Sequence, residues 1–282
     1  MTLFGLSEPA IRLLAFSTIF IALAAIELLA PRLERDEMRG ALKSRRWVTN
    51  LAMVVVSSVA LRIVFPLAAV GTALWAQTNG FGLFPLLGLP LWAAGILAFI
   101  VLDFAVWLEH VVSHKWPLLW RIHRMHHADT GFDLTTALRF HPLEIVLSML
   151  WKAAVIIVLG APPVAVLVFE IVLNGAAMFN HANIKLPKAA DAMLRLAIVT
   201  PDMHRIHHST DPRETDSNYG FNLAIWDRMF STYTQTPRLG DTGLEIGLSE
   251  WRDGRSTANL GWALALPFRF PPKARQRPGT DQ

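Results

Sequence analysis

The fold is decided by the stretch LEIVLSMLWKAAVIIVLGAPPVAVLVFEIVLNGAAMF, which occupies residues 143–179. This stretch is too long for a single membrane crossing. The run Gly160-Ala161-Pro162-Pro163 divides it into two halves of about 17 residues, each just long enough to span a bilayer. We therefore expect a helical hairpin inside a membrane.

Three further apolar stretches precede this hairpin. They are Ala10–Ala30, Val48–Trp75, which is interrupted by Arg62 and Pro66, and Leu86–Leu108. The first is longer than the apolar run of ~7–15 residues that signal peptides use, so we expect it to remain in the protein. The fold class that follows is all-α: an integral membrane protein with about four transmembrane helices arranged as two hairpins.

The composition supports a membrane protein. Of the 282 residues, 53% are hydrophobic and 17% are charged, and the mean hydropathy is +0.37. Soluble domains average roughly 45–50% apolar and 25% charged residues. The absence of cysteine excludes disulfides, thiolate metal sites and a cysteine nucleophile. The net charge is +4, but the basic residues lie beside apolar runs, so we expect a membrane and no nucleic acid as partner.

Basic residues predict the orientation. The connection between the first two apolar stretches contains Arg32, Arg35, Arg39, Lys43, Arg45 and Arg46, whereas the loop 76–85 has no charged residue. Because cytoplasmic loops are enriched in Lys and Arg, the basic connection is expected in the cytoplasm. Residues 109–141 and 181–282 then share that face and form a histidine-rich helical cap. The short loops favour a bacterial inner membrane.

All ten histidines lie between positions 110 and 208. Three boxes, HVVSH, HRMHH and HRIHH, contain eight of them: His110, His114, His123, His126, His127, His204, His207 and His208. Residues at i, i+3 and i+4 share one side of a helix, so each box directs two or three imidazoles toward a common point. A pH sensor would not need this repeated spacing. Because one structural zinc site uses four ligands, the number of imidazoles predicts two metal ions.

Two single histidines and three polar residues extend the expected site. His141 and His181 lie at the two ends of the hairpin on the cytoplasmic side, so we expect both to bind metal. Asp103 shares a helix face with the first box and is expected to accept the second ring N–H of a ligand. Glu170 and Asn174 lie on the stripe that leads to His181, and an intramembrane carboxylate is a functional candidate, so we expect both residues to be outer partners of the ligands. Beyond the metal ligands we expect no separate catalytic residue.

An all-nitrogen site next to apolar helices suits the oxidation of an unactivated lipid C–H bond, which requires a redox metal and dioxygen. The sequence has no phosphate-binding glycine loop, serine nucleophile elbow or dinucleotide fingerprint, so electrons must come from another protein. Two alternatives remain at this point. A membrane metal transporter would need ligands near the middle of the bilayer, and a zinc-dependent membrane hydrolase would need an open site with a general base.

Residues 103–233 resemble the membrane-bound fatty acid hydroxylase and sterol desaturase superfamily. The resemblance rests on HVVSH, HRMHH, TTALRFHPLE, FNHANI, TPDMHRIHH and SNYGFNLAIWDRMFSTY, in this order. It implies a di-iron oxygenase with two Fe ions, which zinc could replace during isolation. It also implies O2 as co-substrate, a sterol, fatty acyl or related lipid as substrate, and a cytochrome, ferredoxin or reductase as external electron donor. Hydroxylation and desaturation are both compatible with it.

The resemblance also assigns residues. The eight boxed histidines match the ligand boxes of the superfamily, and His141 and His181 match positions that are also found among its ligands. His181 is followed by Asn183 and Ile184 instead of a second histidine one turn later, so this cluster is thinner than in some members. We expect Asn218–Asp227 to be chiefly structural.

The chain then divides into an N-terminal transmembrane region (1–100), a fatty acid hydroxylase-like domain (101–236) and a C-terminal cytoplasmic tail (237–282). We expect these three parts to form a single folding unit.

Overall fold

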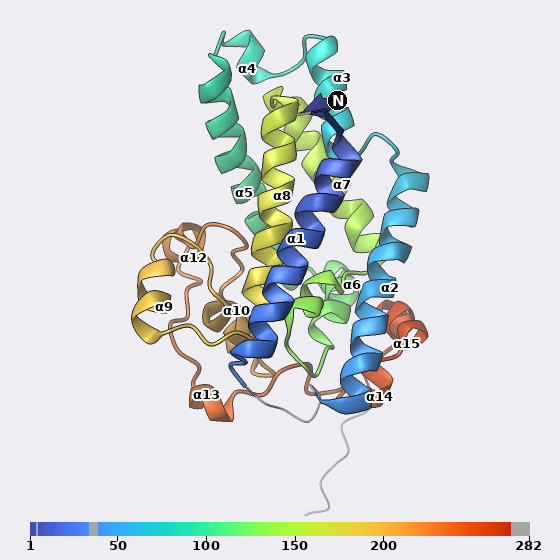
Figure 1. Ribbon diagram of the computed structural model, residues 1–282, viewed down its shortest axis with the longest axis vertical. Helices are drawn as coiled ribbons and strands as arrows, with labels where there is room; N and C mark the ends of the chain where they lie inside the picture. Colours follow the sequence, from blue (N-terminus) through green and yellow to red (C-terminus); the bar gives the residue numbers. More distant parts are fainter. Residues whose placement is uncertain (4, 34–38, 272–282) are drawn as a thin grey trace, which may run out of the picture.

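The computed structural model describes residues 1–3, 5–33 and 39–271 and is built from helices (Figure 1). Long helices run side by side along the long axis of the molecule, and most of the short helices gather at one end of them. The long helices are α1 (Glu8–Leu29), α2 (Gly40–Val64), α5 (Leu91–Lys115), α7 (Pro142–Leu159) and α8 (Pro163–His181).

The short elements fall into two sets. The end of the molecule that contains the first residues holds the antiparallel strands β1 (Thr2–Leu3) and β2 (Leu6–Ser7) and the helices α3 (Ala68–Thr78) and α4 (Leu83–Leu86). The opposite end, which we call the cap, holds α6 (Pro117–His127), η2 (Leu134–Leu138), α9 (Lys188–Leu194), α10 (Pro201–His207), α11 (Pro212–Thr215), α12 (Ile225–Met229), α13 (Gly240–Gly243), α14 (Gly254–Thr257), α15 (Leu260–Ala265) and η3 (Leu266–Phe268).

The predicted hairpin is present as α7 and α8. Gly160 ends α7 in the left-handed conformation, with φ 64° and ψ 45°, and Pro163 begins α8. Glycine after one helix and proline at the start of the next are common, because glycine tolerates positive φ after a helix and proline fits the first helical position. The backbone of Gly82 packs against this turn so closely that an added Cβ would lie 2.1 Å from the Gly160 nitrogen. The glycine pair therefore joins the α3–α4 region to the hairpin tip.

Five segments are long and apolar enough to cross a membrane, one more than the sequence analysis expected. They are Glu8–Leu29, Gly40–Leu86, Leu91–Lys115, Pro142–Leu159 and Pro163–His181. Both halves of the hairpin reach spanning length, as expected, and together with the three upstream segments they give five.

Two predicted segment boundaries also change. The second stretch begins at Gly40 instead of Val48, and its break around Pro66 is the expected one, because proline cannot continue the hydrogen bonding of α2. The third segment continues past Leu108 to Lys115, since no helix-breaking residue occurs before Pro117. As a result, α5 carries the first histidine box out of the apolar region without a change of direction.

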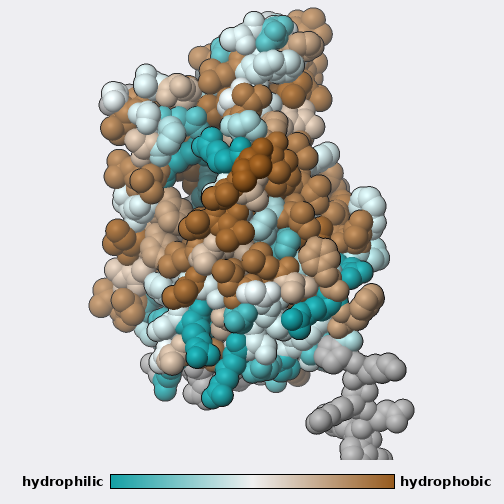
Figure 2. Space-filling view, turned by 90° about the vertical axis from the view of Figure 1, so that its right-hand side faces the viewer, coloured by the Kyte–Doolittle hydropathy of each residue, from teal (hydrophilic) through white to brown (hydrophobic). Residues whose placement is uncertain are grey.

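The long helices pack around the hairpin. The helix α7 contacts α2, α3 and α5, and α8 contacts α1, α3 and α5. Their core contains Leu102, Ile156 and Val166, and the rings of Phe99 and Phe169 meet edge to face with centroids 5.3 Å apart. Large apolar side chains also point outward along the long helices, where Figure 2 shows a broad hydrophobic band above a more hydrophilic cap. Such a band is what a lipid environment requires.

A buried ion cluster ties α2 to the cap. The guanidinium of Arg46 donates to Asp129 Oδ1 through Nε (2.6 Å) and to Asp133 Oδ2 through Nη1 (2.9 Å). All three side chains are almost completely buried. At the same end, Arg32 donates to Asp202 over 3.2 Å. The basic connection between α1 and α2 therefore lies at the same end of the molecule as the histidines.

Much of the predicted tail is packed against the body of the protein. Thr49 donates to the carbonyl oxygen of Ala258 (2.8 Å), and Arg124 donates to that of Leu266 (2.9 Å). Met53, Met125 and Leu266 share one apolar cluster. Residues 237–271 thus cover α2 and α6, whereas Arg35 and residues 272–282 lie outside the described part of the chain.

We predict that Arg46→Ala destabilises the protein by about 3–5 kcal/mol, because it leaves two buried carboxylates without their cation. Thermal unfolding of the detergent-purified protein measures the effect. Arg45→Ala is the matched control, since Arg45 is exposed, and it should change stability by less than about 0.5 kcal/mol. Equal losses in the two variants would contradict this role for Arg46.

Candidate metal centre

Nine of the ten histidines converge in two adjacent groups. Group 1 consists of His110, His114, His123, His127 and His207, and group 2 consists of His126, His181, His204 and His208. All nine side chains are buried, and within each group the candidate ligand atoms lie within 4.8 Å of one another. The groups are neighbours, since the rings of His127 and His208 stack with centroids 4.4 Å apart.

Each of two boxes supplies both groups. On α6, His123 and His127 face group 1, whereas His126 faces group 2. On α10 and just beyond it, His207 faces group 1, whereas His204 and His208 face group 2. Successive helical residues are about 100° apart around the axis, so a helix between two sites can supply both. Each of these two boxes therefore directs two imidazoles toward a common point, as expected, and its third imidazole toward the other group.

Some ring nitrogens have more close nitrogen neighbours than hydrogen bonding can satisfy. In group 2, His181 Nε2 lies 3.1 Å from the Nε2 atoms of His126, His204 and His208. In group 1, His123 Nε2 lies 3.1 Å from His110 Nε2 and 3.2 Å from His127 Nε2. One imidazole nitrogen carries one hydrogen or one lone pair and cannot satisfy three such neighbours.

A shared metal ion does satisfy this spacing. Metal–nitrogen bonds of about 2.0–2.1 Å place neighbouring ligand atoms ~2.8–3.4 Å apart in octahedral or tetrahedral geometry. Buried ring nitrogens without a hydrogen-bond partner in the described residues include both of His114 and Nε2 of His207. Unsatisfied buried polar atoms are costly, and binding a cation would satisfy them. The residues present therefore fit two metal ions.

Burial also keeps five of these imidazoles, His126, His127, His204, His207 and His208, neutral. Loss of solvent, reinforced by nearby histidines, lowers the pKa of His207 to about 3. The same causes lower the pKa values of His126, His127, His204 and His208 well below that of free histidine. A neutral imidazole offers a lone pair, so at neutral pH these side chains are ready to bind a metal.

Backbone carbonyl groups orient several of the rings. His110 Nδ1 lies 2.7 Å from the carbonyl oxygen of Tyr219, and His207 Nδ1 lies 2.7 Å from that of Ser217. A ring N–H that donates to such an oxygen fixes the tautomer and leaves Nε2 free for the metal. The loop after α10 thus acts as the outer partner of group 1.

A carboxylate missed by the sequence analysis orients His123. The Nδ1 atom of His123 lies 2.5 Å from Glu144 Oε1. Such a carboxylate–histidine pair makes the opposite ring nitrogen a better ligand. Glu144 lies three residues after His141, within the RFHPLE motif. Its role depends on the first turn of α7 lying beside α6, which spacing along the chain does not reveal.

Asp103 does not contact a histidine ring, contrary to expectation. It accepts hydrogen bonds from Asn222 Nδ2 (2.8 Å), Trp226 Nε1 (2.8 Å) and the Leu223 backbone (3.3 Å). Seven residues separate it from His110, which is ~10 Å along a helix and beyond the reach of a hydrogen bond. Asp103 instead fixes the loop whose carbonyl groups orient the ligands.

Asp227 holds the same loop from within. It accepts hydrogen bonds from Trp107 Nε1 (3.1 Å) and from the backbone N–H groups of Tyr219 (2.9 Å) and Gly220 (2.8 Å). A Cβ at Gly220 would lie 2.8 Å from a Val199 methyl carbon and 3.0 Å from Asp227, so only glycine fits there. The structural role that we expected of this segment is therefore to position the Tyr219 carbonyl group.

Glu170 and Asn174 also lie away from the histidines. Glu170 accepts hydrogen bonds from Lys152 Nζ (3.0 Å) and Arg12 Nη2 (2.6 Å), and Asn174 donates to the Glu170 carbonyl oxygen (2.9 Å). Both share a helix face with His181, but they lie ~10–16 Å farther along α8. Their expected role as outer partners of the ligands is therefore wrong.

The structure does not bring His141 to either group. Its Nδ1 accepts a hydrogen bond from the Leu143 backbone (3.1 Å), and its Nε2 lies 3.2 Å from the carbonyl oxygen of Leu264. Pro142 begins α7 and holds His141 in an extended conformation. The ring therefore caps the helix N-terminus and faces the η3 side of the cap.

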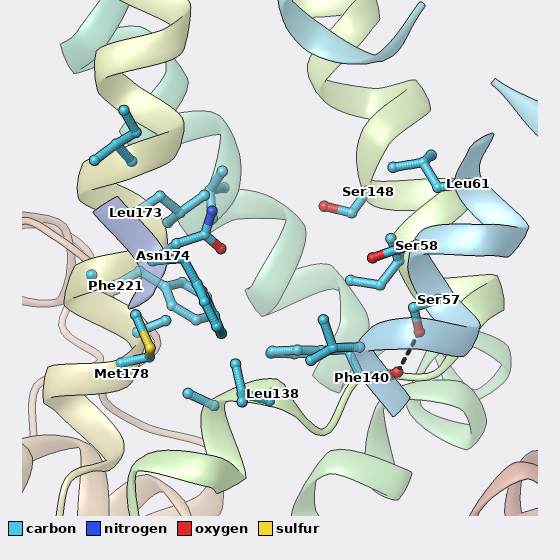
Figure 3. A pocket seen from close by; sticks show the side chains of 18 of the residues that line it. Ser57, Ser58, Leu61, Leu138, Phe140, Ser148, Leu173, Asn174, Met178 and Phe221 are labelled. Atoms are coloured by element: carbon cyan, nitrogen blue, oxygen red, sulfur yellow. Dashed lines mark hydrogen bonds between the residues drawn. The ribbon is translucent and has the colours of Figure 1, made fainter. Parts of the chain in front are cut away.

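A cavity of about 610 Å³ leads from group 1 into the bundle of long helices. His110 and His123 lie on its wall. Figure 3 shows α2 and α8 facing each other across it, with apolar side chains such as Phe140, Met178 and Phe221 turned inward. Cavities of this size hold small molecules.

Comparisons with known proteins agree with this architecture. Residues 95–232 match the fatty acid hydroxylase family. The ornithine lipid hydroxylase OlsE of Rhizobium tropici is 29% identical over 173 residues, which cover 61% of this chain and 50% of that protein. The alkylglycerol monooxygenase of Xenopus tropicalis is 32% identical over 139 residues, covering 49% and 30% respectively. A cholesterol 25-hydroxylase-like protein of Danio rerio is 28% identical over 137 residues, covering 47% and 52%. No solved structure matches the chain.

The membrane-length helices and the two histidine groups define an integral membrane protein of the histidine-box class. Residues 95–232 are similar to the fatty acid hydroxylase family, which confirms the resemblance found in the motifs of this region. The match spans about half the length of the ornithine lipid hydroxylase and less of the alkylglycerol monooxygenase.

Removing one ligand should affect mainly the group to which it belongs. We predict that His207→Ala and His204→Ala each reduce the metal content from about two ions per chain to about one. Elemental analysis of the purified protein measures the content. His141→Ala is the matched control and should retain both ions, at a stability cost of about 1 kcal/mol for the lost helix cap. Loss of metal in His141→Ala would contradict the assignment of nine ligands.

Glu144 should matter through His123. We predict that Glu144→Ala lowers metal affinity about 10–100-fold, because the outer partner of a ligand is lost. Glu144→Gln keeps a hydrogen-bond acceptor and should cost less. Competition with a metal chelator at equilibrium ranks the variants, and equal affinities in all three proteins would rule out this role.

Proposed function

We propose that this protein is a membrane-bound di-iron oxygenase that oxidises a C–H bond of a lipid with dioxygen. The observation that carries the proposal is the opening of a buried, two-group histidine site onto an apolar cavity between membrane-length helices. Group 1 and group 2 would each hold one iron. Imidazole suits iron, and bound iron supplies the redox chemistry that oxygen activation requires.

The side chains of the protein contribute position and environment. His110 and His123 belong to group 1 and also line the cavity, so a lipid chain inside it has carbon atoms next to that group. The apolar wall excludes water and holds the chain, and pre-positioning of one carbon supplies both rate and selectivity. Glu144 and the carbonyl groups of Ser217 and Tyr219 keep the ligand rings fixed during turnover.

The names of the relatives favour hydroxylation over desaturation. They include an ornithine lipid hydroxylase and an alkylglycerol monooxygenase. The substrate is accordingly a membrane lipid, and electrons come from an external cytochrome, ferredoxin or reductase. By the positive-inside rule, the basic connection near Arg32, and the cap with it, faces the cytoplasm of a bacterial inner membrane.

The two alternatives fit the site less well. A transporter needs ligands along a path near the middle of the membrane, whereas the nine grouped histidines lie together at the cap end. A catalytic zinc site uses three protein ligands and an open position, whereas these groups offer five and four imidazoles.

Oxygen transfer can be tested in cells, where membranes supply the donor. Bacteria that express the chain with added iron and are grown under ¹⁸O2 should contain a lipid with one additional ¹⁸O atom, detected by mass spectrometry. His207→Ala should abolish this product because group 1 is incomplete, while His141→Ala should retain it. A labelled product at the wild-type level in His207→Ala would refute the assignment.

A further inference from the structure

The cavity has a second polar end, far from the histidines. Arg12 of α1, Arg62 of α2 and Lys152 of α7 line it, and all three belong to candidate membrane spans. Charged side chains within a bilayer are energetically costly and are kept where they serve a function. His110 and His123 mark the other end, so cations and metal ligands share one cavity.

Two carboxylates hold these cations in place. Glu170 Oε1 accepts from Lys152 Nζ (3.0 Å), and its Oε2 accepts from Arg12 Nη2 (2.6 Å). Glu8 Oε1 accepts from Arg12 Nε (2.7 Å). With Arg62 included, three cations face these two carboxylates, and Glu109, which also lines the cavity, lies close enough for its charge to act on Lys152. The Glu170 side chain is 6% exposed and lies behind Arg12 and Lys152 as seen from the cavity.

The cations retain unused donors. Among the described residues, Lys152 uses one of its three N–H donors on Glu170, and Arg12 uses two of its five on Glu8 and Glu170. On the cavity wall, Glu109 Oε2 accepts from Ser148 (3.0 Å) and Glu144 Oε1 pairs with His123, and within the described residues neither carboxylate bonds to Arg12 or Lys152. The partner that the free donors lack is therefore an anion with several oxygens.

The spacing between the two ends suits an extended chain. Lys152 lies eight residues beyond Glu144 on α7, which is ~12 Å along the helix axis. Because Glu144 touches His123, that length separates the cationic end from group 1. Between the ends, the wall is largely apolar, with Leu138, Leu173 and other side chains visible in Figure 3.

The cavity is open sideways toward the lipid. Leu13 of α1, which is 67% exposed, and the exposed Ser58 of α2 both line it. The helix α1 packs on α8, whereas α2 packs on α7, so the exposed lining lies between α1 and α2. Figure 2 shows hydrophilic atoms beside a hollow within the hydrophobic band. A membrane amphiphile can enter there without crossing water.

We propose that Arg12 and Lys152, oriented by Glu170, bind the anionic head group, a carboxylate or a phosphate, of a single-chain lipid substrate that enters between α1 and α2. Held at this distance, the lipid presents a carbon of its chain to group 1. Arg12 and Lys152 are thus positioning and specificity-determining residues. This inference rests on the proposed function for its meaning, but the binding that it predicts does not require turnover.

The test compares ligands with the same chain and different head groups. Palmitate, hexadecyl phosphate and hexadecanol are competed against tritiated palmitate on the full-length, metal-loaded protein in detergent. At least one anion should bind tenfold or more tightly than hexadecanol, and the preferred anion identifies the head group. Equal binding of all three by the wild-type protein would overturn the inference, and this comparison needs no variant.

Variants then locate the head-group site. Lys152→Met should reduce the preference for the anion at least tenfold and leave hexadecanol affinity within twofold, whereas Lys152→Arg should retain the preference. The control Lys188→Met removes an exposed cation on α9 and should change nothing. An anion preference that survives in both Lys152→Met and Arg12→Gln overturns the assignment.

The experiments distinguish a failure of the head-group proposal from a failure of the oxygenase proposal. His207→Ala should lose oxygen transfer and keep the anion preference. A wild-type protein that prefers the anion but incorporates no oxygen would refute the oxygenase and leave the head-group site standing. Oxygen transfer by a protein without anion preference would refute only the head-group site.

Discussion

The structure depends on one electrostatic constraint: nine buried imidazoles point their nitrogens at two neighbouring places. Nitrogens 3.1 Å apart, with no hydrogen between most of them, form a stable arrangement only around cations. A buried ligand set is therefore also a folding element, because metal binding offsets the cost of burying its polar atoms. The helices α5, α6, α8 and α10 bring these histidines together.

The rest of the cap can be understood as support for this convergence. Asp103 and Asp227 give their acceptor oxygens to one loop, which then offers backbone carbonyl groups to His110 and His207. Arg46 neutralises two carboxylates beside the α6–η2 connection and anchors it to α2. Rigid outer contacts matter because ligand geometry and the position of a bound chain must both hold to within a fraction of an ångström.

The cavity connects this rigid end to the membrane part. Its apolar wall is made by helices whose other faces meet lipid, so the same hydrophobic residues that insert the protein also shape the chain-binding site. The polar groups at the far end are unusual for such a place. Glu170 lies on the α8 stripe that the sequence analysis connected with the metal, but its partners are the cations of α1 and α7.

The sequence by itself determined the helical membrane class, the hairpin around Gly160, the family resemblance and the histidine boxes. These are local properties, since hydrophobic length, helix breakers and i, i+3, i+4 spacing are all read along one segment. Only the tertiary structure decided which histidines share a group, that His141 caps a helix, and that Glu144 supports His123 while Asp103 supports a loop. Those roles depend on which helix lies opposite and on how it is rotated, and packing between distant segments fixes both.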